Sequence, residues 1–171
     1  AAPALLGGFV VSAAIDGGYE AIRFDVPDGL VAVLFIPQLW LETKAMREIL
    51  PSKVPRADAV ANLGRVALGV AGLASGRVDL LRALTVDRLH EPYRASVFPQ
   101  LPLLVAGARK AGALGACLSG AGSTVIAFAE SDRKVAAIGR AFEAVAAEQQ
   151  LPGRVEVARP RNAGATVIEA G

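Results

Sequence analysis

Apolar residues in the first forty positions fall into three short runs separated by turn residues. The runs are GGFVVSAAI (7–15), YEAIRFDVP (19–27) and LVAVLFIP (30–37), and the separators are DGG and PDGL. Glycine supplies the positive φ that tight turns need, so the spacing predicts three strands in an antiparallel meander. The second run alternates imperfectly, which predicts a half-buried strand. The third is apolar on both faces, which predicts a central strand.

Beyond residue 40 the apolar spacing lengthens to three and four, which is the period of a helix. The segment from Pro55 to Gly76 predicts one long amphipathic helix, with proline at its start and glycine just past its end. Shorter helices are expected over 41–50, 78–85 and 98–113. The apolar face of the long helix is expected to carry Val60, Leu63, Val66, Ala67, Val70 and Leu73.

The last third of the chain returns to strands on either side of another helix. STVIAFA (123–129) predicts a strand, and 131–150 predicts a helix with Ser131 as its N-cap. RVEVARP (154–160) and GATVIEA (164–170) predict two closing strands. The pattern therefore predicts an α+β fold: an antiparallel strand meander, helices, and then a β-α-β unit. We divide it into residues 1–54 and 55–171.

Composition narrows the class of protein. Hydrophobic residues make up 53% and charged residues 20%, which is typical of a globular chain. The formal charge of +2 is too small to indicate nucleic-acid binding. The longest apolar runs fall well short of the roughly 20 residues that a membrane-spanning helix needs. The single cysteine, Cys117, excludes a disulfide framework and a cysteine-based zinc site, so we expect a cytoplasmic protein without a metal site of its own.

The glycine-rich stretch GALGACLSGAGST (112–124) invites comparison with phosphate-binding loops. A P-loop needs lysine where this chain has Ala121, and a dinucleotide fingerprint needs a third glycine where it has Val125. A strand also follows, where both motifs require a helix. The stretch therefore predicts a hairpin between ACLS and STVIAFA. Its small residues serve either tight packing or close approach to a ligand.

The run G-A-L-G-A-x-L-S-G-A-G, from Gly112 to Gly122, resembles the third conserved motif of the GHMP kinases, in the form found in homoserine kinases. Ser123 stands where that family usually has proline, a change that adds a hydrogen-bond donor. Other stretches resemble segments of the same family in the same order: APALLGGFVVS (2–12), ETKAMREILP (42–51), DRLHEPYRASVFP (87–99) and NAGATVI (162–168).

The resemblance implies a ferredoxin-like β-α-β GHMP kinase C-terminal domain. It also implies transfer of the ATP γ-phosphate, with Mg²⁺, to the hydroxyl of L-homoserine in threonine biosynthesis. It places two substrate-binding arginines on Arg47 and Arg94, whose planar guanidinium groups suit a carboxylate. A solvated Arg47, and an Arg94 paired with Asp87 or Glu91, are the alternatives. The residues expected to brace the family's phosphate loop are Gly115, Ser119, Gly120, Ala121 and Gly122.

The remaining reactive and polar side chains are interpreted mostly as structural. His90 is expected to pack or cap a helix, and Cys117 to fill space as a small apolar residue. Asp87 and Glu91 are interpreted as a solvated helix end. Ser119 and Thr124 could donate to phosphate or substrate, Ser119 being the better candidate. No residue of this chain is assigned a catalytic role.

Three hallmarks of the family have no counterpart in the sequence: the Pro-x-x-x-Gly-Leu-Gly-Ser-Ser-Ala phosphate loop, the His-Pro-Asp-Asn motif and the acidic Mg²⁺ ligand. We therefore expect the C-terminal portion of a kinase, whose partner is the N-terminal half of the same protein. Alone it should be inactive and should not bind ATP or Mg²⁺ strongly. An exposed meander would favour a homodimer.

Three other functions stay open at this point. A ferredoxin-like regulatory module that binds small amino acids would use the same two arginines. Another GHMP kinase, acting on a mevalonate-type or sugar substrate, is the second. An interaction protein is the third, and its mark would be a large exposed apolar patch. A kinase half separated from its other domain would show such a patch too.

Overall fold

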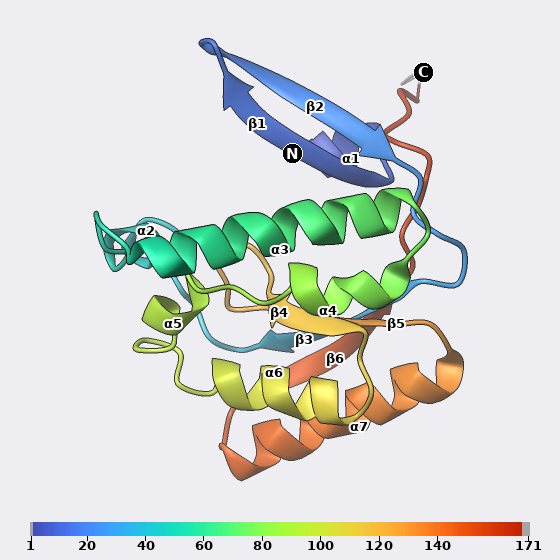
Figure 1. Ribbon diagram of the computed structural model, residues 1–171. Coiled ribbons are helices and arrows are strands. Elements are labelled where there is room, and N and C mark those ends of the chain that lie inside the picture. The colour runs from blue at the N-terminus through green and yellow to red at the C-terminus, as the bar shows by residue number, and fades with distance from the viewer. Residues whose placement is uncertain (1, 169–171) are drawn as a thin grey trace.

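The computed structural model describes residues 2–168, in which a four-stranded antiparallel sheet lies between two layers of helices (Figure 1). The strand order is β4-β5-β3-β6. Helices α6 and α7 cover one face, and α4 with the long α3 lies over the other. The bounds are β3 Val31–Pro37, β4 Gly115–Leu118, β5 Val125–Ala129, β6 Gly153–Ala158, α3 Arg56–Ala74, α4 Leu81–Leu84, α6 Leu101–Lys110 and α7 Asp132–Glu148.

The predicted β-α-β unit is formed by β5, α7 and β6. Both strands pair antiparallel to β3, which lies between them, so β5 and β6 run parallel to each other. Ser131 caps α7 as expected, because its side chain accepts a hydrogen bond from the backbone N–H of Lys134. The α+β class and the ferredoxin-like unit are confirmed.

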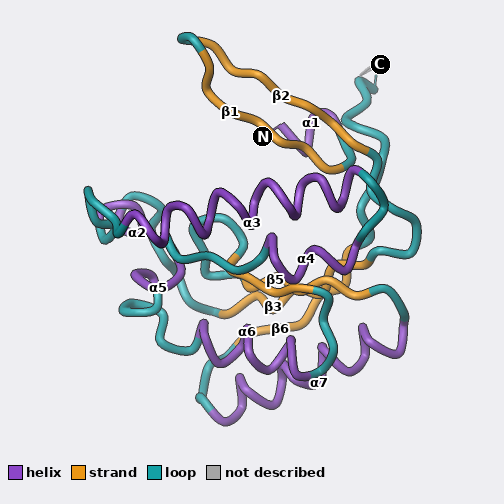
Figure 2. The backbone as a smooth tube through the Cα atoms, in the orientation of Figure 1, coloured by secondary structure: helices purple, strands orange, loops and turns teal. Residues whose placement is uncertain are grey.

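The predicted meander is wrong at its third strand. Strands β1 (Phe9–Ile15) and β2 (Gly18–Phe24) form a separate two-stranded hairpin, which stands away from the main sheet on the far side of α3 (Figure 2). Strand β3 instead lies between β5 and β6, because its apolar residues require cover on both faces. The expectation of a half-buried second strand is wrong too, since β2 is exposed from Gly18 to Arg23.

The division after residue 54 stays a prediction. By its pairing, β3 belongs to the same sheet as β4, β5 and β6, although it precedes residue 54 in the chain. The other short elements are α1 (Ala2–Leu6), which the sequence pattern did not predict, α2 (Ala45–Glu48), η1 (Val78–Leu80) and α5 (Glu91–Arg94).

Helix α3 forms where predicted, but of its predicted apolar face only Leu73, at the C-terminal end, is buried. Val60 and Leu63 are 59% and 71% exposed, and the helix is buried through Gly69, Gly72 and Leu73. A Cβ at Gly69 would lie 2.4 Å from the Cβ of Leu84, so the glycines are what let α4 approach. Helix α3 is long and apolar enough to cross a membrane. Core helices of soluble proteins also meet this criterion of length and composition.

The main core lies between the sheet and the α6–α7 layer. Phe35 of β3 and Phe142 of α7 are fully buried, with ring centroids 5.9 Å apart. Phe98, Leu104 and Ile138 are also buried there. A smaller cluster of Leu30, Leu73 and Leu81 lies under α3.

The C-terminal segment 159–168 contains no strand, so the predicted strand over 164–170 is wrong for its described part; residues 169–171 lie outside the described residues. This segment instead ties the hairpin to the domain. The side-chain amide of Asn162 both accepts from the N–H and donates to the C=O of Val26, at 2.8 and 3.2 Å. The backbone N–H of Ala165 donates to the carbonyl of Leu5.

Candidate functional site

The glycine-rich stretch forms a hairpin, as predicted, and residues 119–124 make its loop. Strands β4 and β5 pair antiparallel up to Leu118 and Val125. The N–H of Ser119 then donates to the carbonyl of Thr124 (2.8 Å), and the N–H of Gly122 donates to the carbonyl of Ser119 (3.2 Å). Gly120 and Gly122 both have positive φ, +63° and +100°, which the turn requires.

The predicted loop-bracing residues separate into two environments. Ser119 and Gly120 are exposed at the tip, and Ala121 and Gly122 are half-buried beside them. Gly115 is buried in β4, away from the tip, where an added Cβ would lie 2.5 Å from Thr85 Oγ1 and 2.6 Å from the carbonyl oxygen of Leu81. Gly115 therefore serves close packing of β4 against α4.

Arg94 makes direct contact with the loop. Its Nη1 donates to the carbonyl oxygen of Gly120 at 2.8 Å, and its Nε approaches the carbonyl oxygen of Met46 at 3.4 Å. Met46 lies in α2 and precedes Arg47, so the elements that carry the two predicted arginines meet beside the loop. The Arg47 side chain is exposed and makes no hydrogen bond to another described residue.

Asp87 holds the start of α5 by accepting hydrogen bonds from several donors. The backbone N–H groups of His90 and Glu91 donate to its Oδ2 at 2.6 and 2.5 Å, and the Asn62 side chain of α3 donates to its Oδ1 at 2.8 Å. Burial by itself would raise the pKa of Asp87, but these hydrogen bonds outweigh it and lower the pKa to about 2. His90 occupies the N-cap position of α5, but its exposed side chain makes no capping hydrogen bond and instead pairs with Asp87 through Nδ1 at 3.1 Å, so the structure does not support the predicted packing or capping role.

Glu91 is the residue whose role the sequence interpretation missed. It is half-buried, and its Oε1 accepts a hydrogen bond of 2.6 Å from the backbone N–H of Leu118, where β4 ends. Burial raises the pKa of Glu91 above its ordinary value, and the hydrogen bond from Leu118 acts in the opposite direction. The interpretation of Asp87 and Glu91 as a solvated helix end is therefore wrong. Pro92 in the first turn was the available signal that a capped helix begins here.

A hollow of about 220 Å³ lies against one side of the loop. It is lined by Glu91, Arg94, Cys117 and Gly120, together with Asp87 and His90. A wider hollow of about 600 Å³, lined by Trp40, Thr43, Lys44 and Ser123, lies against the second half of the loop. The Ser123 hydroxyl, the donor that replaces the family's proline, donates to the carbonyl of Leu39 at 2.6 Å.

The first hollow carries groups suited to an anion. Arg94 supplies a cation and Gly120 brings the backbone of the loop tip to the hollow, while the Glu91 carboxylate is engaged by the N–H of Leu118. Burial raises the pKa of the Cys117 thiol to about 12, and the Glu91 carboxylate adds to the effect, so this thiol is a packing group and no nucleophile. Among residues 2–168, no three His, Cys, Asp or Glu side chains cluster closely enough to hold a metal ion.

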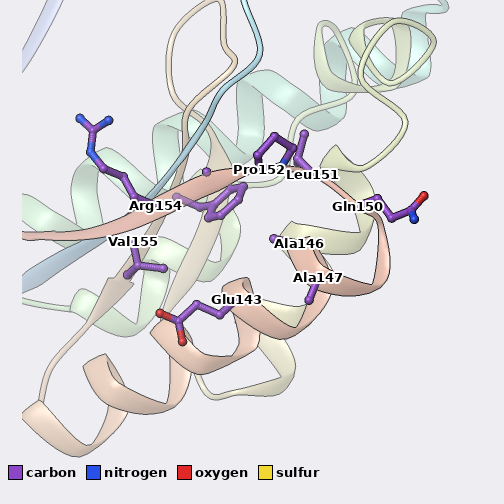
Figure 3. Close-up of a pocket in the computed structure, with 10 residues that line it drawn as sticks. Glu143, Ala146, Ala147, Gln150, Leu151, Pro152, Arg154 and Val155 are labelled. Atoms are coloured by element: carbon purple, nitrogen blue, oxygen red, sulfur yellow. The ribbon is translucent and has the colours of Figure 1, made fainter.

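A third hollow, of about 420 Å³, lies at the C-terminal end of α7 (Figure 3). Its lining combines apolar residues such as Ala146, Leu151 and Val155 with Glu143 and Arg154. None of the site residues predicted from the sequence lines it.

Comparison with known proteins identifies the domain that carries the loop. Residues 70–148 match the model of the GHMP kinase C-terminal region, and this part of the chain is a GHMP kinase C-terminal domain. Over nearly its whole length the chain is also similar to homoserine kinases. It is 43% identical to the enzyme from Moorella thermoacetica over 98% of this chain, and 39% identical to that from Deinococcus radiodurans, again over 98%.

The solved structures agree. The crystal structure of homoserine kinase from Cytophaga hutchinsonii has a TM-score of 0.88 and 32% identity over 95% of this chain. Mevalonate kinase from L. major, at 18% identity and a TM-score of 0.68, shares the fold. The chain spans about half the length of the relatives it matches: 56% of the Moorella protein, 54% of the Deinococcus protein and 51% of the Cytophaga chain. The chain is thus similar to the C-terminal part of homoserine kinases.

Proposed function

We propose that the protein to which this chain contributes transfers the γ-phosphate of ATP to the side-chain hydroxyl of L-homoserine, and that this chain supplies part of the amino-acid site. The single observation that supports it most strongly is the contact between Arg94 and the loop at Gly120. That contact joins the two stretches that most resemble homoserine kinases, EPYR and LSGAG, in one place.

In this proposal Arg94 and Arg47 bind the carboxylate of homoserine. Arg94 donates through Nη1 to Gly120 and through Nε to Met46, and its remaining N–H groups can donate to a carboxylate in the adjoining hollow. Arg47 is exposed on the neighbouring α2 and makes no competing hydrogen bond to another described residue.

The loop tip is proposed to brace the phosphate-binding loop of the missing part. Gly120 is open to its surroundings, with no atom within 4 Å of a built Cβ, so another backbone can approach it closely. Phosphoryl transfer depends mainly on positioning and on neutralising charge. ATP and Mg²⁺ would be held chiefly by residues outside this chain, which supplies no cluster of acidic ligands within residues 2–168. We place the enzyme in the cytoplasm.

The proposal is tested by restoring the missing part. In what we call the joined protein, the N-terminal part of M. thermoacetica homoserine kinase precedes this chain. Formation of ADP is followed with L-homoserine, mevalonate or galactose as the acceptor, and the intact Moorella enzyme is the control. We expect turnover with L-homoserine and none with the others. A folded joined protein that binds ATP but does not phosphorylate L-homoserine would contradict the proposal.

A further inference from the structure

Two side chains of helix α5 contact the glycine loop, one just before its first residue and the other at its second residue. Glu91, in its first turn, accepts from the N–H of Leu118, and Arg94, three residues later, donates to the carbonyl of Gly120. Residues three apart lie on the same side of a helix, so both side chains reach the loop together. Ser119, the exposed serine of the loop, is the residue between the two contact points.

The helix that carries these two side chains is itself held by its neighbours. Asp87 binds the backbone N–H groups at its start and also accepts from Asn62 of α3. Arg109 of α6 separately holds β4 by donating through Nη2 to the carbonyls of Thr85 and Ala116, both at 2.9 Å. The contact from Glu91 therefore connects the loop to a helix that is anchored to α3 through Asp87.

The Glu91 contact falls at the end of β4, where the paired strands give way to the loop. Leu118 is the last residue of β4, and its side chain is buried at 8% exposure. Without Glu91 its N–H, at a buried position, would lose its charged acceptor, and hydrogen bonds to charged groups are among the stronger ones. The start of the loop would then be held only by the hydrogen bond from Ser119 to the carbonyl of Thr124, while Arg94 still held Gly120.

We infer that Glu91 is a positioning residue: it holds the start of the glycine loop in register with Arg94, and so sets where the proposed substrate-binding guanidinium and Ser119 lie. This inference rests on the proposed function, and it assigns Glu91 no contact with substrate. A glutamine at this position would keep an oxygen that accepts from Leu118, whereas an alanine would not. The comparison of Glu91→Gln with Glu91→Ala therefore isolates the hydrogen bond from the charge.

The first test measures amide hydrogen exchange by NMR in the 171-residue chain. In Glu91→Ala we expect the N–H groups of Leu118 and Ser119 to exchange about tenfold faster than in the wild type, with Val33 of the central strand unchanged. Glu91→Gln should restore slow exchange. Equal exchange in all three proteins would overturn the inference, as would a Gln variant that behaves like Ala. Faster exchange at Val33 would show general unfolding and would also count against it.

The second test uses steady-state kinetics of the joined protein. We expect Glu91→Ala to raise KM for L-homoserine about tenfold, to leave KM for ATP within twofold, and to be rescued by Glu91→Gln. An unchanged KM for L-homoserine in Glu91→Ala would overturn the role of Glu91 in positioning the site. Should the joined protein with Glu91 intact show no turnover, the proposed function fails, and the exchange experiment alone decides whether Glu91 holds the loop.

Discussion

The guanidinium of Arg94 and the carbonyl of Gly120 are 2.8 Å apart, Nη1 to O, although the residues are 26 positions apart in the chain. This hydrogen bond places a residue proposed to bind substrate on the loop that identifies the family. Arg94 therefore has two proposed roles: it holds the loop, and it binds the carboxylate of the substrate. Arg47, which makes no side-chain hydrogen bond to another described residue, has only the second.

Replacing each arginine by alanine should consequently have different effects on the stability of the chain but similar effects on the binding of L-homoserine. Arg94→Ala should lower the free energy of unfolding of the chain by about 1 kcal/mol, because a charge-assisted hydrogen bond is lost. Arg47→Ala, an exposed change, should stay within about 0.5 kcal/mol of wild type. In the joined protein both should raise KM for L-homoserine. Urea unfolding and steady-state kinetics measure these effects, and an Arg47→Ala variant with unchanged KM would remove Arg47 from the site.

Two glycines of the same hairpin should respond in different ways to alanine. Gly115→Ala forces a methyl group to within 2.5 Å of Thr85 and 2.6 Å of the Leu81 carbonyl, so we expect a loss of about 2–3 kcal/mol. Gly120→Ala meets no atom within 4 Å, and its positive φ alone should cost about 1 kcal/mol. Chemical denaturation of both variants gives the comparison. A Gly120 variant less stable than the Gly115 variant would contradict this account of the packing.

Lowering the pH should destabilise the folded chain by protonating Asp87. Its pKa is about 2 in the folded chain, against 3.8 ordinarily, so the carboxylate stabilises the fold above pH 4. That contribution is lost as the pH falls from about 4 to 2, and it amounts to about 1 kcal/mol after allowance for solvent screening. Glu91, whose pKa is raised, titrates at a higher pH. Unfolding free energies at pH 4 and pH 2 should differ more in the wild type than in Asp87→Asn. Equal differences would show that Asp87 is not responsible.

Substitutions on the exposed apolar face of α3 should have little effect on the stability of this chain and a larger effect on the stability of the joined protein. Leu63 is 71% exposed, so Leu63→Ser should change the stability of the chain by less than about 0.5 kcal/mol. If the N-terminal part packs here, the same change should lower the thermal stability of the joined protein by several degrees. Leu73→Ala, at a position 4% exposed, is the control and should destabilise both proteins. Equal, small effects of Leu63→Ser in both would place the N-terminal part elsewhere.

Local patterns predicted most elements but not their partners. Period and capping located α3, α6 and α7, and the glycine spacing located the β4–β5 hairpin. The two strands that pair with β3 lie 90 to 126 positions away in the chain, so local patterns paired it with its neighbour β2 instead. The burial of α3 likewise depends on Gly69 and Gly72, which carry no hydrophobic signal and act by letting α4 approach.

For the candidate site too, sequence patterns predicted some features and missed those that depend on distant contacts. Motif resemblance located Arg94 and the loop, and the structure brings them into contact. Glu91 was not recognised, because its role depends on a hydrogen bond to a backbone group 27 residues away that no side-chain pattern encodes. Gly115 fell within the same motif as the loop tip, yet its surroundings in β4 show that it packs against α4.

The central claim is that this chain holds part of a homoserine kinase site and completes it only together with the N-terminal part. The most direct measurement is ATP-dependent phosphorylation of L-homoserine, detected as the phosphorylated product, by the 171-residue chain alone and by the joined protein under the same conditions. We expect no product from the chain alone and turnover by the joined protein. Product formed by the chain alone, or a folded joined protein that forms none, would contradict it.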